Sequence, residues 1–474
     1  MSTFSGLNTA YRGLVAARQG IDVVGQNIAN ANSDGYTRQR VTTSPVPAAG
    51  TVGLFRGGIR AGEGVSVDGI ARLGDAYLDA RVRSSASVAG HWGARAEALT
   101  DLEATLNEPG TNGLSAQLSK FWSAWADVSN DAGDAAPANV LLEESSILAA
   151  RISSGYADVD AQWSGLRLKA DSMAAEINDA ASKVADLNAA IRSTLAGGGS
   201  ANELLDQRSV LTTRIAALAG GSTRPLADGT VEVLVGGNSI VTGDAFRPVK
   251  LTGSYLMAGA SASPPSLEWV DRAGSAIPLE GGELAGVVSM LAPADGSGTG
   301  GSIAEAAASY NAFAADLVAQ VNAAHRTGST RAGVTGVDFF AVTAGVPTAQ
   351  GITVLPTSVD GIAAGAPGAG GFDGSVADLI AQLGVGADSP STVWAKIVTG
   401  IGIATRSNVQ QSRVADLAAT SAVRTQLATS SVDMDEENVN LLTFQVAYQG
   451  AARVLTAVDE MLDVLINRTG LVGR

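Results

Sequence analysis

The sequence predicts a mainly α-helical protein that carries a β-rich insertion. This prediction rests on heptad spacing of apolar residues at both ends of the chain, helical spacing through most of the interior, and an alternating pattern within 221–282. We expect the N- and C-terminal helices to pair as a coiled coil, the interior helices to form a long bundle, and the insertion to form a small outer β domain.

The first element, within residues 1–40, is predicted to be a helix with a heptad seam. Its apolar positions recur at alternating steps of three and four, with Leu or Ile at one position and mostly small residues at the other. The seam consists of Leu7, Ala10, Leu14, Ala17, Ile21, Val24 and Ile28. Taken alone, this helix fits an ordinary amphipathic helix on a globular core equally well.

The stretch GQNIANANSDGYTRQRV, residues 25–41, predicts that this helix ends in a loop. Asn27, Asn30, Asn32 and Gly35 form the loop motif, because Asn and Gly tolerate left-handed backbone and cap helix ends. We expect an extended connector over 41–74, which is rich in Gly, Pro and Ser.

The spacing of apolar residues divides the interior of the chain into helical, β-rich and loop segments. Helical spacing over 75–220 predicts a bundle domain, which 283–340 and 393–430 complete, and a Gly/Ala-rich loop region occupies 341–392. Between these helical parts, 221–282 predicts a β-rich insertion domain because its short alternating runs are punctuated by glycine.

The last element, 431–474, is a second helix with a heptad seam. Its seam consists of Leu441, Phe444, Tyr448, Ala451, Leu455, Val458, Leu462 and Leu465. Charge favours pairing of the two ends: residues 1–40 hold four arginines and two aspartates, a balance of +2, whereas 431–474 hold three arginines and seven acidic residues, a balance of −4. We therefore expect the two terminal helices to be partners in a coiled coil.

Composition narrows the function. The formal net charge of −15 disfavours nucleic acid and anionic membrane surfaces as partners. No stretch reads as a membrane span or a cleaved signal peptide, so we expect no membrane insertion. Cysteine is absent, which excludes disulfides, thiolate nucleophiles and Cys-based metal sites.

Nothing in the sequence predicts catalysis, a cofactor or a metal site. The chain has two histidines, His91 and His325, without metal-ligand spacing, and we expect both to be surface or core residues. The acidic run DMDEE, 433–437, lacks the spacing of a calcium loop, and Ser431 or Asp433 can cap the last helix while the acids meet its dipole.

The opening FSGLNTAYRGLVAARQGIDVVGQNIANANSDGYTRQRV resembles the start of bacterial flagellar axial proteins, the group of rod, hook and hook-associated proteins. NELLDQRSVLTTRIAAL, GGELAGVV, FAADLVAQVNAAHRTG with GVDFF, and DEENVNLLTFQVAYQGAARVLTAVDEMLDVLINRTG resemble one family within that group, the flagellar hook-associated protein 1 family of hook–filament junction proteins. The resemblance spans the helical parts of nearly the whole chain. It departs at 341–391, which is short where members of the family often carry a large outer β insertion.

The resemblance implies a structural, non-enzymatic component of the bacterial flagellum that connects hook to filament and is needed for filament assembly. It implies a ring or helical homo-oligomer whose neighbours are the hook protein and the second hook–filament junction protein, and a cytosolic export chaperone that binds the C-terminal helix. It also implies an extracellular location, reached through the flagellar type III apparatus without a cleaved signal peptide. Alternatives are another axial protein, a hook or rod subunit, or a secreted coiled-coil adhesin.

Overall fold

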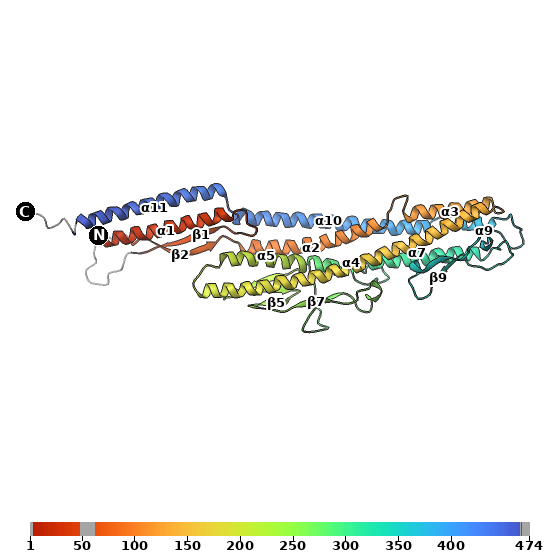
Figure 1. Ribbon diagram of the computed structural model, residues 1–474, viewed down its shortest axis with the longest axis horizontal. Helices are drawn as coiled ribbons and strands as arrows, with labels where there is room; N and C mark the ends of the chain where they lie inside the picture. The colour runs from red at the N-terminus through yellow and green to blue at the C-terminus, as the bar shows by residue number, and fades with distance from the viewer. Residues whose placement is uncertain (1–2, 48–61, 465, 467–474) are drawn as a thin grey trace, which may run out of the picture.

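A computed structural model describes residues 3–47, 62–464 and 466. The molecule is elongated, and the start of α1 and the end of α11 lie at the same end of it (Figure 1). The helices are α1 Thr3–Asn30, α2 Ala76–Thr105, α3 Leu114–Asn130, α4 Ala135–Ala196, α5 Asn202–Ala219, α6 Gly282–Met290, α7 Ser302–His325, α8 Thr348–Gly351, α9 Ser375–Gln382, α10 Pro390–Ser430 and α11 Met434–Asp463. The strands are β1 Gln39–Pro45, β2 Val65–Arg72, β3 Ser222–Pro225, β4 Val231–Val235, β5 Asn238–Thr242, β6 Ala245–Phe246, β7 Val249–Thr252, β8 Ser266–Trp269, β9 Phe340–Val342 and β10 Ile352–Val354. The predicted fold class, mainly α with a β-rich insertion, is confirmed.

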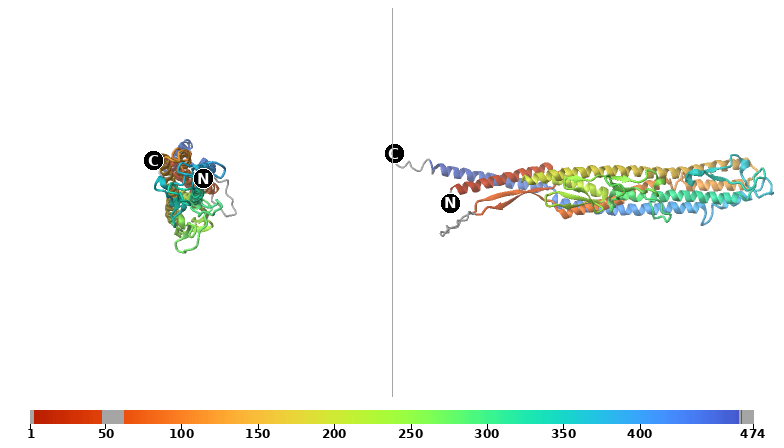
Figure 2. Two further views of the ribbon diagram at one scale, coloured as in Figure 1. Left: turned by 90° about the vertical axis from the view of Figure 1, so that its right-hand side faces the viewer. Right: turned by 90° about the horizontal axis from the view of Figure 1, so that it is seen from below.

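The long bundle is built around α4. This helix has 62 residues, which at ~1.5 Å per residue gives a length of roughly 93 Å. Its first turn is capped by the carboxylate of Asp134, which accepts a hydrogen bond from the amide of Ala136. Helices α2, α3, α5, α7 and α10 pack along it or along one another, which gives the molecule the narrow cross-section seen end-on in Figure 2.

Aromatic side chains fill the end of the bundle that lies far from the termini. Trp125 of α3 is fully buried, with its ring centroid 5.0 Å from that of Phe339, and Trp394 at the start of α10 packs against Tyr310 and Phe313 of α7. The Trp125 contact joins α3 to the segment before β9, and the Trp394 contacts join α10 to α7. The Trp-rich stripe of α3 therefore belongs to the core.

His325, at the end of α7, is a fully buried core residue. Its Nδ1 lies 2.8 Å from the carbonyl oxygen of Val337, and its Nε2 accepts a hydrogen bond from the amide of Ala363 at 2.9 Å. Because the amide must donate to Nε2, the ring carries its proton on Nδ1 and is neutral. Burial lowers the pKa of His325 below its ordinary value.

The β-rich insertion lies on one flank of α4. Strands β3, β4, β5 and β6 form an antiparallel sheet, and β7 and β8 form a second, two-stranded one. Side-chain amides on α4 bind the backbone of the insertion: Asn188 Nδ2 donates to the carbonyl oxygens of Val231 in β4 and Gly243 in the turn after β5, and Asn178 Nδ2 donates to that of Val249 in β7. Buried polar groups of the helix and the strands thus satisfy one another.

Two short β elements lie at opposite ends of the molecule. Strands β1 and β2 pair antiparallel and lie alongside α1, whereas β9 and β10 pair at the far end, where β9 contacts α7 and β10 contacts α4 (Figures 1 and 2). The structure thus places short strands and the helices α8 and α9 within the Gly/Ala-rich 341–392 region.

Among the described residues, no helix combines the length and apolar content that a membrane span requires.

Candidate assembly interface and polar junction

Helices α1 and α11 pack side by side as an antiparallel pair, the terminal hairpin, which projects beyond the bundle (Figure 1). The two helices approach each other most closely at three glycines of α1, Gly6, Gly13 and Gly20, which are spaced seven residues apart. We call this row of glycines the close-approach line. A methyl group on Gly6 would lie 3.8 Å from Val458, one on Gly13 would lie 3.8 Å from Ala451, and one on Gly20 would lie 2.5 Å from the ring of Phe444. Each step of seven along α1 matches a step of seven backwards along α11, as a two-helix heptad seam requires.

The predicted interface residues of α1 fall into two groups. Ala10, Ala17 and Val24 are buried, at 6%, 3% and 3% exposure, and each lies four residues after a glycine of the close-approach line. The larger side chains are only half-buried and flank that line; they are Leu7, Leu14, Ile21 and Ile28. The predicted seam is therefore displaced by one position, because a search for apolar side chains passes over glycine.

On α11 the predicted positions face α1, with one exception among the described residues. The half-buried ones are Leu441, Phe444, Ala451, Leu455, Val458 and Leu462. Tyr448 is 37% exposed, since it flanks the line that runs through Phe444 and Ala451. Leu465 lies outside the described residues.

The Asn-rich loop turns the chain from α1 into β1, and its first member is the most tightly held. Asn27 is 1% exposed: its Nδ2 donates to the carbonyl oxygen of Gln39 at 2.9 Å and to Glu437 Oε2 at 3.0 Å. Its Oδ1 accepts from the amide of Gln39 at 3.0 Å and from the Tyr36 hydroxyl at 2.9 Å. All four hydrogen-bonding positions of the amide are used, so this side chain ties α1 to the loop, to β1 and to α11.

The other motif residues shape the turn itself. Asn30 Nδ2 donates to the carbonyl oxygen of Gln26 at 3.0 Å, and Asn32 lies exposed in the turn. Gly35 has φ +76°, and Val210 packs so closely against it that any side chain would collide. Both observations require glycine at this position.

An ion-pair cluster joins the loop to the start of α11. Arg38 Nε donates to Glu437 Oε1 at 2.7 Å, and Arg38 Nη1 donates to Glu436 Oε2 at 2.8 Å. These contacts raise the pKa of Arg38 and lower that of Glu436. Asp433 caps α11 as predicted, but the 1% exposed Glu437 has a second role, as the buried partner of Asn27 and Arg38.

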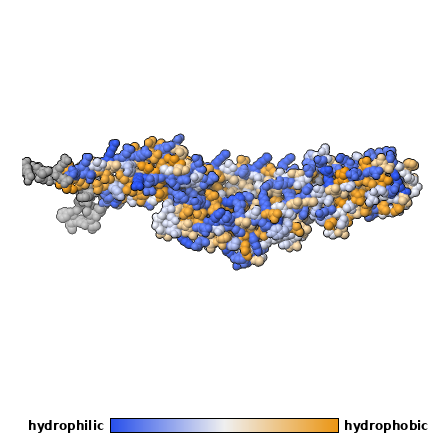
Figure 3. Space-filling model, in the orientation of Figure 1, coloured by the Kyte–Doolittle hydropathy of each residue, from blue (hydrophilic) through white to orange (hydrophobic). Residues whose placement is uncertain are grey.

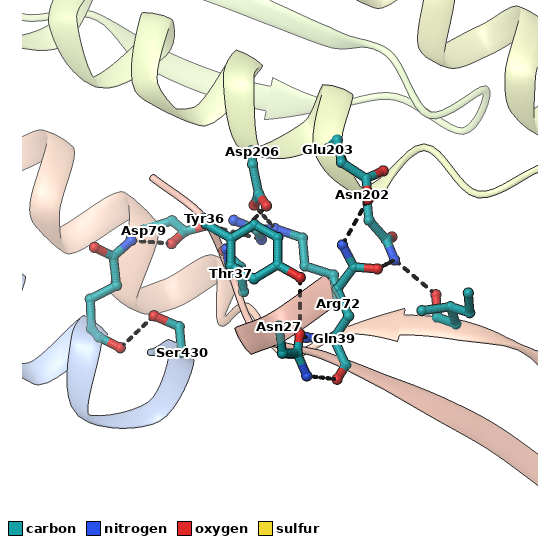
Figure 4. A network of polar contacts seen from close by, with 12 residues as sticks. Asn27, Tyr36, Thr37, Gln39, Arg72, Asp79, Asn202, Glu203, Asp206 and Ser430 are labelled. Atoms are coloured by element: carbon teal, nitrogen blue, oxygen red, sulfur yellow. Dashed lines mark hydrogen bonds and ion pairs between the residues drawn. The ribbon is translucent and has the colours of Figure 1, made fainter. Parts of the chain in front are cut away.

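The same loop is bonded to the bundle through α5 (Figure 4). Asp206 accepts from the amide of Thr37 at 3.0 Å and from Arg72 Nε at 2.6 Å, and Glu203 accepts from Gln39 Nε2 at 3.1 Å. Burial, and then the nearby carboxylates of Glu203, Asp206 and Glu437, raise the pKa of Tyr36 to about 12.

We call the connected set around Asn27, Arg38, Glu437, Arg72 and Asp206 the polar junction. It fixes the terminal hairpin to the bundle, because α1, α11, β1, β2 and α5 all contribute to it. Sequence reasoning identified Asn27 alone among these residues as part of a site. The described residues contain no group of His, Asp and Glu able to hold a metal ion.

Family models match the chain in separate regions. The helical domain of flagellar hook-associated protein FlgK matches residues 99–340, about half of the 474 residues. The chain belongs to the FlgK family of flagellar hook-associated proteins. Models of flagellar basal body rod proteins match its ends, at 7–37 and 425–468, as expected if axial proteins share their terminal helices.

Individual members of the FlgK family are also similar to this chain in sequence and in fold. The chain is 27% identical to flagellar hook-associated protein 1 of Bacillus subtilis, with both chains covered over their full lengths. It is also 27% identical to that of Escherichia coli, where the match covers 71% of this chain and 60% of the relative. The structure of the flagellar hook junction protein FlgK from Burkholderia pseudomallei has the same fold, with a TM-score of 0.63 at 14% identity over 74% of this chain and all of that one.

This FlgK-family chain is a structural component of the flagellum, a hook-associated junction protein. The predicted family is confirmed, and the alternatives of a hook or rod subunit or an adhesin are not favoured, because the match to the FlgK helical domain lies in the interior, which distinguishes the axial proteins.

Proposed function

We propose that the terminal hairpin is the part through which copies of this chain assemble into the ring or helical layer that joins hook to filament. The observation that carries the proposal is a second apolar stripe on α11. Its residues are large, largely exposed side chains at helical spacing: Val439 at 63%, Leu442 at 62%, Val446 at 68%, Val454 at 50%, Met461 at 57% and Val464 at 48%.

The outer stripe lies on the face of α11 opposite α1. At 100° per residue, Leu442 lies roughly 160° around the helix from Phe444, and Val446 lies roughly 140° from Ala451. Apolar surface also gathers on the terminal hairpin in the space-filling view (Figure 3). A helix that is apolar on both faces needs a partner on each, and α1 covers only one of them. A neighbouring copy covers the other.

We further propose the finer partners that the family suggests. The hook protein adjoins the layer on one side and the second hook–filament junction protein on the other. Before assembly, a cytosolic export chaperone covers the outer stripe of α11, and the chain leaves the cell through the flagellar type III apparatus without a cleaved signal peptide. One exposed apolar stripe supports both roles, because it needs a cover in the cytosol and in the finished structure.

The division into domains is part of the same proposal. Residues 1–40 and 431–474 act as the inner, assembling domain, while the bundle of 75–220, 283–340 and 393–430 and the insertion of 221–282 lie outside it. The polar junction supports this division, because the chain crosses between the hairpin and the bundle there, with the carbonyl oxygen of Ser430 accepting from the amide of Arg38 at 2.9 Å.

A matched pair of substitutions tests the proposal. Leu442 on the outer stripe and Leu168 on α4 are both 62% exposed, so an aspartate at either position leaves the folded monomer intact. We expect Leu442→Asp to abolish incorporation into isolated hook–basal body complexes, because a charge in a packed interface costs several kcal/mol. Leu168→Asp should incorporate normally, and equal circular dichroism spectra establish that both fold. Normal incorporation of Leu442→Asp would contradict the proposal.

A further inference from the structure

A cavity of about 250 Å³ lies where the start of α2 crosses α5 beneath strands β3 and β4. At ~30 Å³ per water molecule, it has room for about eight waters, or for one small ion with part of its hydration shell. Its charged lining consists of three arginines and one carboxylate: Arg72 at the end of β2, Arg83 and Asp79 on α2, and Arg208 on α5. Such a cluster needs an electrostatic explanation in a chain with a formal net charge of −15.

The nearby carboxylates neutralise only Arg72. Its Nε donates to Asp206 Oδ1 at 2.6 Å, and its Nη1 lies 3.7 Å from Asp79 Oδ2. Both carboxylates also accept hydrogen bonds from other groups: Asp206 accepts one from the amide of Thr37, and Asp79 accepts one from Gln426 Nε2 at 2.5 Å. Three guanidinium groups against two carboxylates leave the cavity with an excess of one positive charge.

Arg208 is buried without an acidic partner. Only 8% of it is exposed, and its Nη1 donates to two neutral acceptors at 2.8 Å, the side-chain oxygen of Asn188 and the carbonyl oxygen of Gly229. Burial, reinforced by repulsion from Arg72, lowers the pKa of Arg208 to about 10. An anion that reaches this buried guanidinium stabilises its positive charge, which no carboxylate of the described residues neutralises.

Arg83 is half-buried, and within the described part of the chain it forms neither a hydrogen bond nor an ion pair within 4.0 Å. The charge of Asp79, one turn earlier on α2, acts on it from a greater distance, but burial outweighs this effect and lowers the pKa of Arg83. Its guanidinium therefore retains unused donors where it lines the cavity.

We propose that this cavity is a binding site for a small oxyanion of the phosphate class, held by Arg83 and Arg208. Planar guanidinium groups bind tetrahedral oxyanions through paired charge-assisted hydrogen bonds. Arg72 couples the site to the polar junction through Asp206, so a bound anion also stabilises the crossing of α2 and α5 that supports the terminal hairpin.

Isothermal titration calorimetry of the full chain with inorganic phosphate tests the site, at constant ionic strength set with chloride. Arg83→Gln is the test variant, and Arg81→Gln is the matched control, because Arg81 is exposed on the same helix. We expect saturable binding to the unsubstituted chain and to Arg81→Gln, and a Kd at least about tenfold weaker for Arg83→Gln, as loss of a charge-assisted hydrogen bond predicts. Absence of saturable binding, or equal Kd values for all three proteins, would overturn the proposal.

Thermal unfolding without phosphate gives a second, independent readout. If Arg83 is an unpaired cation that awaits an anion, Arg83→Gln should have a Tm equal to or above that of the unsubstituted chain. A Tm clearly lower than that of Arg81→Gln would mean that Arg83 serves the fold itself, and would also overturn the proposal.

Discussion

Alanine substitutions of three glycines in α1 should change the stability of the terminal hairpin by different amounts, depending on what each glycine faces. Replacing glycine by alanine inside a helix stabilises it by about 1 kcal/mol when nothing else changes. Gly25 is exposed, and a methyl group added there would have no heavy atom within 4 Å, whereas one added at Gly13 would lie 3.8 Å from Ala451, an ordinary contact. Gly25→Ala and Gly13→Ala should therefore each stabilise the hairpin by up to about 1 kcal/mol.

Gly20→Ala should behave differently because its methyl group would lie 2.5 Å from two ring carbons of Phe444. Carbon atoms pack at ~3.5–4.0 Å, so ring and helix must separate by about 1 Å or more. Overpacking of this kind costs about 1–3 kcal/mol, which cancels or exceeds the gain in helix propensity. We expect a net destabilisation of about 0–2 kcal/mol.

Native-state hydrogen exchange of α1 amides in the full chain measures these differences as free energies of local opening. The expected order of protection is Gly25→Ala and Gly13→Ala above the unsubstituted chain, with Gly20→Ala at or below it. Equal protection in Gly20→Ala and Gly25→Ala would refute the close approach of α1 to α11 at Phe444, and with it the register of the terminal hairpin.

Two further predictions concern buried ionisable groups. Glu437→Ala should destabilise the polar junction by about 3 kcal/mol, because it leaves Arg38 and Asn27 without their buried partner. Glu436→Ala removes a side chain that is 57% exposed and should cost less than about 1 kcal/mol. Urea unfolding that does not distinguish the two variants would contradict this prediction. Because burial lowers the pKa of His325, its contribution to stability is fully present above the unfolded-state pKa of about 6.5 and is lost as pH falls towards the folded-state pKa. Tm should therefore fall between pH 7 and pH 5 by less in His325→Gln than in the unsubstituted chain; an equal fall would show that His325 does not titrate on unfolding.

The fold was largely predictable because its main signals are local. The heptad spacing of Phe444, Ala451 and Val458 identifies the face of α11 that meets α1, and the change of periodicity after α5 identifies the insertion. The close-approach line of α1 was missed for a physical reason. Gly6, Gly13 and Gly20 carry no side chain, so they add nothing to an apolar pattern, although their seven-residue spacing is present in the sequence.

The polar junction was less predictable because its partners are distant in sequence. Asn27 and Glu437 are 410 positions apart, and Arg72 and Asp206 are 134 apart. Local reasoning assigned the acidic run at the start of α11 to capping and the helix dipole, which holds for the cap residue Asp433. It could not show that one carboxylate in that run turns inward, since that depends on where Arg38 is placed by the loop after α1.

Electron microscopy of cells that lack this chain tests most directly whether it joins hook to filament through the terminal hairpin. Cells without the gene should carry hooks without filaments and should release filament subunits into the medium. Supplying the unsubstituted chain or Leu168→Asp should restore filaments, whereas Leu442→Asp should leave bare hooks. Normal filaments in cells that lack the chain, or in cells that carry only Leu442→Asp, would contradict the account.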